Sequence, residues 1–154
     1  DAKKFCELLS QEFEMDFDLP NEAQWEKAAR GMDGRKYPWG NTLPDRTLAN
    51  YGQNIGGTSA VGFFPAGASP YGVQDMAGNV LEWVLDWYEE QYYAQSPVKN
   101  PTGPKRGQYR VVRGGSYDDS EEYLRTTSRD WNEPDITQDV IGFRCVIIPS
   151  EGNL

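Results

Sequence analysis

Apolar side chains recur with helical spacing in two stretches near the start of the chain. In residues 2–13 the apolar positions share one helical face, while charged positions occupy the others. The members of that face are Ala2, Phe5, Cys6, Leu9 and Phe13. In residues 21–30, Asn21 is suited to cap a helix and Gln24 completes a capping-box pattern. We therefore predict two helices, at about 2–13 and 21–30, each with a buried apolar face.

Shorter apolar runs farther along the chain predict strands. Residues 110–113 and 141–148 are rich in β-branched side chains and are predicted to form short antiparallel strands. Residues 58–64 are a third, weaker candidate for a short strand. The dense aromatic and apolar block at 80–87 follows turn residues at 77–79, which favours a turn followed by a buried strand.

Composition sets the class of protein. A chain of 154 residues with 13% aromatic residues, 16 Gly and 10 Pro is typical of one loop-rich domain whose core is filled largely by rings. The formal net charge of −9 argues against nucleic acid and anionic membranes as partners. Because no apolar run approaches the roughly 20 residues of a membrane helix, we expect no direct membrane insertion.

The residues that most often carry catalysis are scarce. The chain contains no His, which excludes Ser-His and Cys-His nucleophile systems and histidine metal ligands within it. It contains two cysteines, Cys6 and Cys145. From the residues alone, two buried thiols in a reducing compartment and one disulfide both remain open.

One cluster of oxygen donors accompanies the turn before the aromatic block. Asp75, Asn79, Glu82 and Asp86 lie within twelve residues of one another. Carboxylate and amide oxygens are the ligands that Ca²⁺ prefers. Solvated acids beside a buried strand are the alternative, since no EF-hand pattern is present.

Six blocks of sequence, in order, resemble the formylglycine-generating enzyme (sulfatase-modifying factor) family. The blocks are LPNEAQWEKAARG at 19–31, YPWGN at 37–41, TSAVGFFPAGASPYG at 58–72, GVQDMAGNVLEWVLDWY at 72–88, RVVRGGSY at 110–117 and IGFRCV at 141–146. The resemblance implies an α+β, C-type-lectin-like fold with little regular secondary structure. It also implies one domain over 1–154 that lacks the strand-bearing segment preceding the first helix in the family.

The resemblance fails at the family's catalytic position. Enzymes of this family use two cysteines shortly after the block that matches Gly114 to Tyr117, and these cysteines hold copper. Here residues 118–124 contain no thiol. We therefore expect no copper, no formylglycine synthesis and no catalytic residues in this chain.

The resemblance also implies a metal site and a cross-link. Carried over from the family, Asp75 and Glu82 are side-chain ligands of a structural Ca²⁺, to which Gly78 and Val80 contribute carbonyl oxygens. Family members with cysteines at both matched positions join them, which implies a Cys6–Cys145 disulfide. A bridged chain would favour a cell-surface or secreted location, and the location is otherwise unknown.

The segment 117–140 is polar and aromatic, with no helical or strand period. It resembles the variable region of proteins diversified by diversity-generating retroelements, whose C-type-lectin-like domains end soon after a motif such as Gly142–Arg144. The residues predicted to contact a ligand on one exposed surface are Tyr117, Asp118, Asp119, Ser120, Tyr123, Trp131, Asn132 and Ile136. Arg125, Arg129 and Arg144 are instead predicted to form ion pairs within the scaffold.

Three functions follow from these patterns. The first is a non-catalytic ligand-binding display domain that uses the 117–140 segment to contact a protein or another macromolecule. The second is a non-catalytic accessory domain of a larger enzyme or signalling protein. The third is a divergent enzyme that uses paired carboxylates, although no such pair is marked by its spacing.

Overall fold

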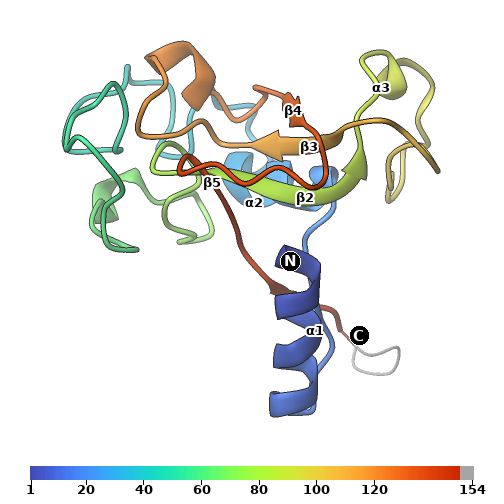
Figure 1. Cartoon of the computed structure of the whole chain (residues 1–154). Helices are drawn as coiled ribbons and strands as arrows, with labels where there is room; N and C mark the ends of the chain where they lie inside the picture. The colour runs from blue at the N-terminus through green and yellow to red at the C-terminus, as the bar shows by residue number, and fades with distance from the viewer. Residues whose placement is uncertain (150–154) are drawn as a thin grey trace.

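The computed structural model describes residues 1–149, which form a small mixed sheet, one packed helix and long loops (Figure 1). The helical elements are α1 (Ala2–Phe13), α2 (Glu22–Arg30), η1 (Pro65–Gly67), α3 (Tyr92–Gln95) and η2 (Glu121–Leu124). The strands are β1 (Phe17–Asp18), β2 (Leu81–Trp87), β3 (Arg110–Arg113), β4 (Asp130–Asn132), β5 (Ile141–Phe143) and β6 (Val146–Ile147). The predicted α+β, loop-rich fold is confirmed.

The main sheet has the strand order β4-β3-β2-β5. β2 is antiparallel to β3, with Trp83 opposite Val112, and β3 is antiparallel to β4. The predicted strand at 110–113 is therefore confirmed, and the block at 80–87 forms the strand β2. Alternate residues of β2 are buried, as expected for a strand with one face on the core.

The helix α2 packs on the sheet and supplies its core. Asn21 and Gln24 form both hydrogen bonds of the predicted capping box, at 2.8 Å each. Trp25 and Ala29 are buried with Met76, Val84 and Val111 in one hydrophobic cluster. The second predicted helix and its apolar face are confirmed.

The long region between α2 and β2 is held by a second cluster and by turns. Tyr37, Ala49, Ala77 and Leu124 are buried together, and Tyr37 stacks on Trp39 with ring centroids 5.2 Å apart. The predicted strand at 58–64 is wrong: this stretch turns at 61–63 and forms no strand. The apolar residues that suggested a strand are split between the exposed Phe63 and the buried Phe64.

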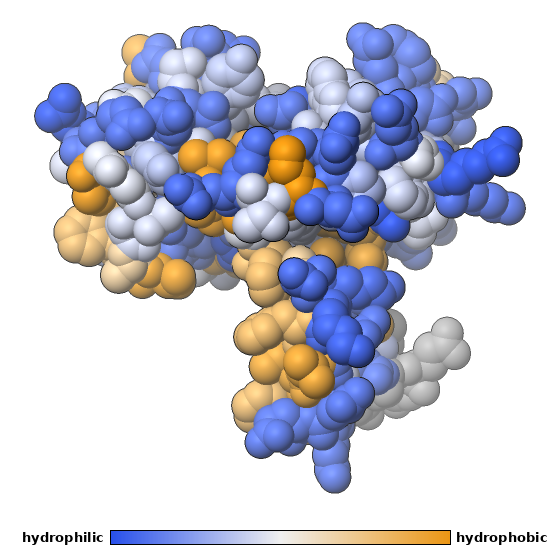
Figure 2. All heavy atoms as spheres, in the orientation of Figure 1, coloured by the Kyte–Doolittle hydropathy of each residue, from blue (hydrophilic) through white to orange (hydrophobic). Residues whose placement is uncertain are grey.

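The helix α1 stands away from the sheet with β1 and β6, and we call these three elements the stalk (Figure 1). Cys6 is bonded to Cys145 beside β6, with Cα atoms 5.7 Å apart. The first helix has its predicted bounds, but its predicted burial is wrong, because only Cys6 is buried. Phe5 and Phe13 are 50% and 59% exposed, and Figure 2 shows apolar side chains along one side of α1.

The predicted strand at 141–148 is divided in two. β5 pairs with β2 in parallel, which corrects the predicted antiparallel arrangement, whereas β6 pairs with β1 in the stalk. Arg144 and Cys145 separate the two strands, since Arg144 turns toward the main body and Cys145 bonds to α1. Within residues 1–149, no helix has the length and apolar character needed to cross a membrane.

Candidate binding surface

The 117–140 segment connects β3 to β5. It is held to the main sheet because part of it forms the edge strand β4. Residues 130–132 form the edge strand β4, in which Trp131 lies opposite Val111. Residues 121–124 form the short helix η2. The sequence of this segment shows no helical or strand period, because elements this short leave none.

The start of the segment is fixed by backbone hydrogen bonds to distant loops. Tyr117 N donates to Asn79 O at 2.9 Å, and Tyr117 O accepts from Gln53 N at 2.8 Å. Asp119 O accepts from Gly52 N at 2.9 Å, while its side chain accepts from Ser116 N at 2.8 Å. These bonds place residues 117–119 beside the loop that contains Gly52 and Gln53.

Two buried residues fix the middle of the segment. Leu124 has no exposed surface and belongs to the hydrophobic cluster around Tyr37. Thr126 is equally buried, and its N–H donates to Lys36 O at 2.8 Å. Neither was predicted from the sequence, although Leu124 is the only aliphatic side chain between residues 117 and 135.

The eight predicted contact residues are all at least partly accessible, but they lie in three places. Tyr117, Asp118, Asp119, Ser120 and Tyr123 adjoin the 50–54 loop and η2. Trp131 and Asn132 lie on the edge strand β4. Ile136 lines a separate groove with Trp83 and Phe143. One segment thus carries all eight, and the fold distributes them over these three places.

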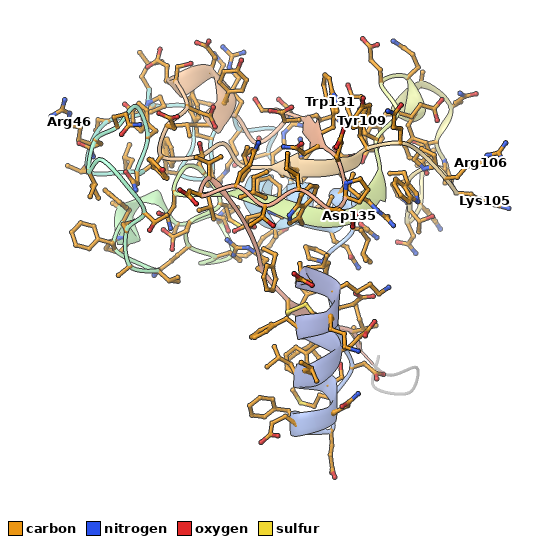
Figure 3. The ribbon with its side chains drawn as sticks, viewed as in Figure 1. Arg46, Lys105, Arg106, Tyr109, Trp131 and Asp135 are labelled. Atoms are coloured by element: carbon orange, nitrogen blue, oxygen red, sulfur yellow. A yellow bond between two sulfur atoms is a disulfide. The ribbon has the colours of Figure 1, made fainter. Side chains whose placement is uncertain are left out.

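Trp131, which is labelled in Figure 3, stacks on one member of a cluster formed by Tyr88, Tyr93 and Arg129. Its ring stacks on Tyr88 with centroids 4.3 Å apart and remains 43% exposed. The Arg129 guanidinium lies 5.0 Å from the ring centroids of both Tyr88 and Tyr93. Tyr88 and Tyr93 come from outside the 117–140 segment, and no sequence signal linked them to Trp131.

Ion pairs lie beneath this cluster, between the sheet and α2. Both nitrogens Nε and Nη2 of Arg129 donate to the Glu22 carboxylate, at 2.6 and 3.0 Å. Arg113, which has no exposed surface, donates to Glu26 at 2.6 Å and to Thr126 O at 2.9 Å. Glu22 is 2% exposed, so its charge is compensated by arginine and not by water.

Asp86 is a third buried acid in this region. It is 2% exposed, and its Oδ2 accepts from the backbone N–H of Glu22 at 2.7 Å. Burial raises the pKa of Asp86 to about 6, even though the hydrogen bond from Glu22 favours the ionised form. Asp86 therefore changes charge around pH 6.

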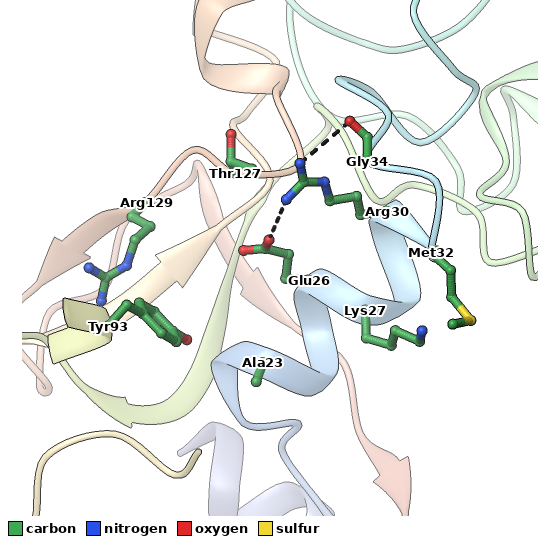
Figure 4. A pocket seen from close by; sticks show the side chains of 10 residues that line it. Ala23, Glu26, Lys27, Arg30, Met32, Gly34, Tyr93, Thr127 and Arg129 are labelled. Atoms are coloured by element: carbon green, nitrogen blue, oxygen red, sulfur yellow. Dashed lines mark hydrogen bonds and ion pairs between the residues drawn. The ribbon is translucent and has the colours of Figure 1, made fainter. Parts of the chain in front are cut away.

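A cleft of about 690 Å³ opens between α2, α3 and the loop residues Thr127 and Arg129 that precede β4 (Figure 4). Glu26, Arg30, Tyr93 and Arg129 contribute to its walls. Arg30 is occupied within the cleft, since it donates to Glu26 at 3.2 Å and to Gly34 O at 3.4 Å. Arg129 is also bound, by Glu22, so both arginines of the cleft already have acidic partners.

The residues predicted to bind Ca²⁺ have other partners in this arrangement. Both oxygens of Glu82 accept from Arg144, at 2.6 and 2.7 Å, and one also accepts from Trp25 Nε1 at 2.7 Å. Arg144 further donates to the carbonyl oxygen of Asp75 at 3.3 Å. Within residues 1–149, no three acidic or cysteine side chains converge into a metal-binding cluster.

The other predicted Ca²⁺ ligands are Asp75, Gly78 and Val80. Asp75 Oδ2 accepts from Gly62 N at 2.6 Å, and the loop also contains Gly78 and Val80, whose carbonyls were predicted ligands. As placed, both carboxylate oxygens of Glu82 are bound by Arg144, so a Ca²⁺ at Glu82 would have to displace this guanidinium. The calcium site itself is not tested and stays a prediction.

The predicted scaffold arginines have two outcomes. Arg129 and Arg144 form ion pairs with Glu22 and Glu82, as expected. The expectation for Arg125 is wrong, because this side chain is exposed and forms no ion pair in the described part of the chain. It follows η2 directly, where the backbone turns Leu124 inward and Arg125 outward.

The fold and the held 117–140 segment define a loop-rich α+β domain of the formylglycine-generating-enzyme class. Residues 1–148 match the model of the FGE-sulfatase family, described as a sulfatase-modifying factor enzyme 1-like domain. The chain belongs to this family.

Two curated relatives show how differently this domain is used. The chain is 38% identical over 146 residues to a formylglycine-generating enzyme of Streptomyces coelicolor, covering 82% of this chain and 45% of the enzyme. It is 41% identical over 131 residues to the serine/threonine-protein kinase pkn1 of Chlamydia pneumoniae, covering 82% of this chain and 20% of the kinase. The chain thus spans less than half the length of either relative.

Two solved structures share the fold. PvdO from Pseudomonas aeruginosa superposes with a TM-score of 0.83 at 28% identity, over 96% of this chain and 58% of that one. Treponema denticola variable protein 1 superposes with a TM-score of 0.75 at 34% identity, over 88% of this chain and 49% of that one. One structural neighbour is therefore a variable protein.

Proposed function

We propose that this domain is a non-catalytic ligand-binding module that presents the 117–140 segment to a macromolecular partner. The main support for the proposal is that the scaffold fixes the segment at both ends and at two buried residues. Its ends continue into β3 and β5, and Leu124 and Thr126 are buried between them. Apart from Arg129, which binds the buried Glu22, the exposed side chains between these fixed points can vary without changing the core.

The likeness to Treponema denticola variable protein 1 supports this reading, since it covers 88% of the present chain. The composition of the segment supports it as well. Tyr123 and Trp131 are 45% and 43% exposed among short polar side chains. Tyr and Trp give large contact areas at a small cost in conformational entropy, which suits binding surfaces.

The non-catalytic part of the proposal rests on the sequence. The chain has no His, and residues 118–124, after the Gly114–Tyr117 block, contain no cysteine. The two cysteines that are present, Cys6 and Cys145, are bonded to each other in the stalk. No thiol is therefore placed to hold copper or to act as a nucleophile at the family's catalytic position.

A combinatorial library tests the proposal. Seven positions are varied together, namely Tyr117, Asp118, Asp119, Ser120, Tyr123, Trp131 and Asn132, and folding and binding are measured for each variant. We expect most variants to keep a cooperative thermal transition, while their binding to a panel of proteins and peptides changes. A matched library at exposed stalk positions Glu7, Leu8, Gln11 and Glu12 should leave binding unchanged. Widespread unfolding of the first library would contradict the proposal.

An accessory role is the second candidate, and one observation favours it. The chain matches 20% of a Chlamydia protein kinase at 41% identity, so the same domain occurs within a larger signalling protein. In that case the surface would contact another part of the same assembly. Sequences of close siblings separate the two: differences concentrated in 117–140 favour display, and differences spread evenly favour the accessory role.

A further inference from the structure

We infer that the partner of the 117–140 surface is a basic protein segment, recognised through unpaired acids and exposed aromatic rings. This inference rests on the proposed function, because it names the chemistry that the same surface would bind. Three independent features of the described structure support it: the charge of the segment, the lack of internal partners for that charge, and the rings that accompany it.

The negative charge of the chain is concentrated in this segment. Residues 117–140 contain eight acidic and two basic side chains, a formal charge of −6 against −9 for the whole chain. Six of the eight acids are exposed, among them Glu121, Glu122, Glu133 and Asp135. A surface with this density of one sign raises the local concentration of oppositely charged partners and speeds their association.

The fold does not neutralise these acids. None of the eight takes part in an ion pair among the described residues. Arg129, one of the two bases in the segment, is bound to the buried Glu22 and is therefore not available to them. An acidic partner would meet this charge with repulsion, and a neutral partner would desolvate it without compensation. A basic partner supplies the missing counter-charges.

The exposed aromatic rings favour one kind of basic side chain in the partner. Trp131 stacks on Tyr88, which covers part of its ring and leaves the side chain 43% exposed. Guanidinium groups bind well over such rings, and this chain uses the same contact internally. The Arg110 guanidinium lies 3.6 Å from the ring centroid of Trp87. We therefore expect arginine in the partner to be preferred over lysine.

The test uses three short peptides of equal length, rich in arginine, in lysine and in glutamate, titrated against the full chain at low and high salt. The arginine peptide should bind most tightly, and its affinity should fall about tenfold or more as salt shortens the screening length. The double variant E121K/E122K should lose about tenfold or more in affinity, since attraction becomes repulsion. The variant E7K/E12K makes the same change in net charge on the stalk and should lose less than about threefold.

A substitution of Trp131 tests the contribution of the aromatic ring separately from that of charge. Trp131→Ala should reduce the preference for arginine over lysine and leave the salt dependence unchanged, since it removes the stacking surface and no charge. Equal losses in E121K/E122K and E7K/E12K would overturn the inference, because binding would then follow net charge alone. Failure of the arginine peptide to bind the wild-type chain would overturn it as well.

The two proposals fail in distinguishable ways. If Trp131→Ala or E121K/E122K alters binding of a neutral or acidic protein from the library panel while basic peptides do not bind, the basic partner is excluded and the surface still binds. If no substitution in 117–140 changes binding of any partner, the proposed function fails together with this inference.

Discussion

The acids of this protein fall into two groups that differ in what compensates their charge. Glu22 and Glu82 are buried, and each is bound by an arginine whose side chain is itself mostly buried. The acids of the 117–140 segment lie mostly in solvent and have no ion-pair partner among the described residues. The buried group fixes the scaffold, because burial without a partner would cost several kcal/mol. The exposed acids remain hydrated, so their charge costs little folding free energy, and they are available to bind a partner.

This difference shows how the domain separates stability from recognition. The pairs of Arg129 with Glu22 and of Arg144 with Glu82 join elements that are 107 and 62 residues apart in the chain. Arg129 lies within the 117–140 segment and Arg144 follows it, so the segment is tied to the scaffold by charge as well as by strands. Four sets of substitutions, from the largest expected effect to the smallest, test this separation.

Glu22→Ala is expected to be the most damaging. It leaves Arg129 and the fully buried Arg113 without their shared carboxylate, at a cost of about 3–5 kcal/mol in the free energy of unfolding. Urea denaturation measures the loss. The matched change on the surface, Glu121→Ala, should cost less than about 0.5 kcal/mol. A loss below about 1 kcal/mol in Glu22→Ala would show that the buried pair does not hold the scaffold.

Arg144→Met should cost about 3 kcal/mol, because Glu82 remains buried with only Trp25 as a donor. Thermal melts of the wild type with added calcium and with a chelator decide whether the 75–82 loop also binds a cation. If Glu82 stays with Arg144, neither addition shifts the midpoint. A midpoint that rises with calcium, and no longer does so in Glu82→Gln, would establish the predicted metal site.

Asp86 should make stability depend on pH. Its folded-state pKa of about 6 lies above the unfolded value, so the neutral carboxyl contributes stability that is complete below about pH 4 and is lost as pH rises through 6. The wild type should therefore be about 1 kcal/mol less stable at pH 8 than at pH 5 through this group. Asp86→Asn should remove that contribution in urea titrations at the two pH values, whereas the exposed Asp118→Asn should not.

The smallest effects on stability are expected at the exposed acids. Replacing Asp118, Glu133 and Asp139 with Ala, singly or together, should change the free energy of unfolding by less than about 0.5 kcal/mol each. Thermal and urea melts measure this. A combined loss of several kcal/mol would show that these acids belong to the scaffold, and the contrast between the two groups would disappear.

The two main helices show how far a sequence pattern reaches. Both were predicted with their bounds from apolar spacing, and α2 carries its capping box as expected. The pattern did not reveal what each helix packs against. Trp25 is 1% exposed under the sheet, whereas Phe5 in α1 is 50% exposed on the stalk. The spacing of apolar residues predicts that a helix has an apolar face. Whether another element covers that face is seen only in the tertiary structure.

The candidate surface was also predicted in part. The boundaries of the segment followed from the strands on either side, and Trp131 was recognised as an exposed ring. Its partner Tyr88 was not, because a stack between residues 43 positions apart leaves no local pattern. Neither Leu124 nor Thr126 was identified as a fixed point, since a single buried residue has no period of its own.

The sequence by itself determined the family, both α-helices of the stalk and core, and the strands at 81–87 and 110–113, because local spacing and capping chemistry act over a few residues. Only the tertiary structure decided that 141–148 divides between two sheets and that Glu82 faces Arg144. Both outcomes depend on which charged side chains and strand edges come into contact when the long loops close. These contacts join residues far apart in the chain, so no local sequence pattern encodes them.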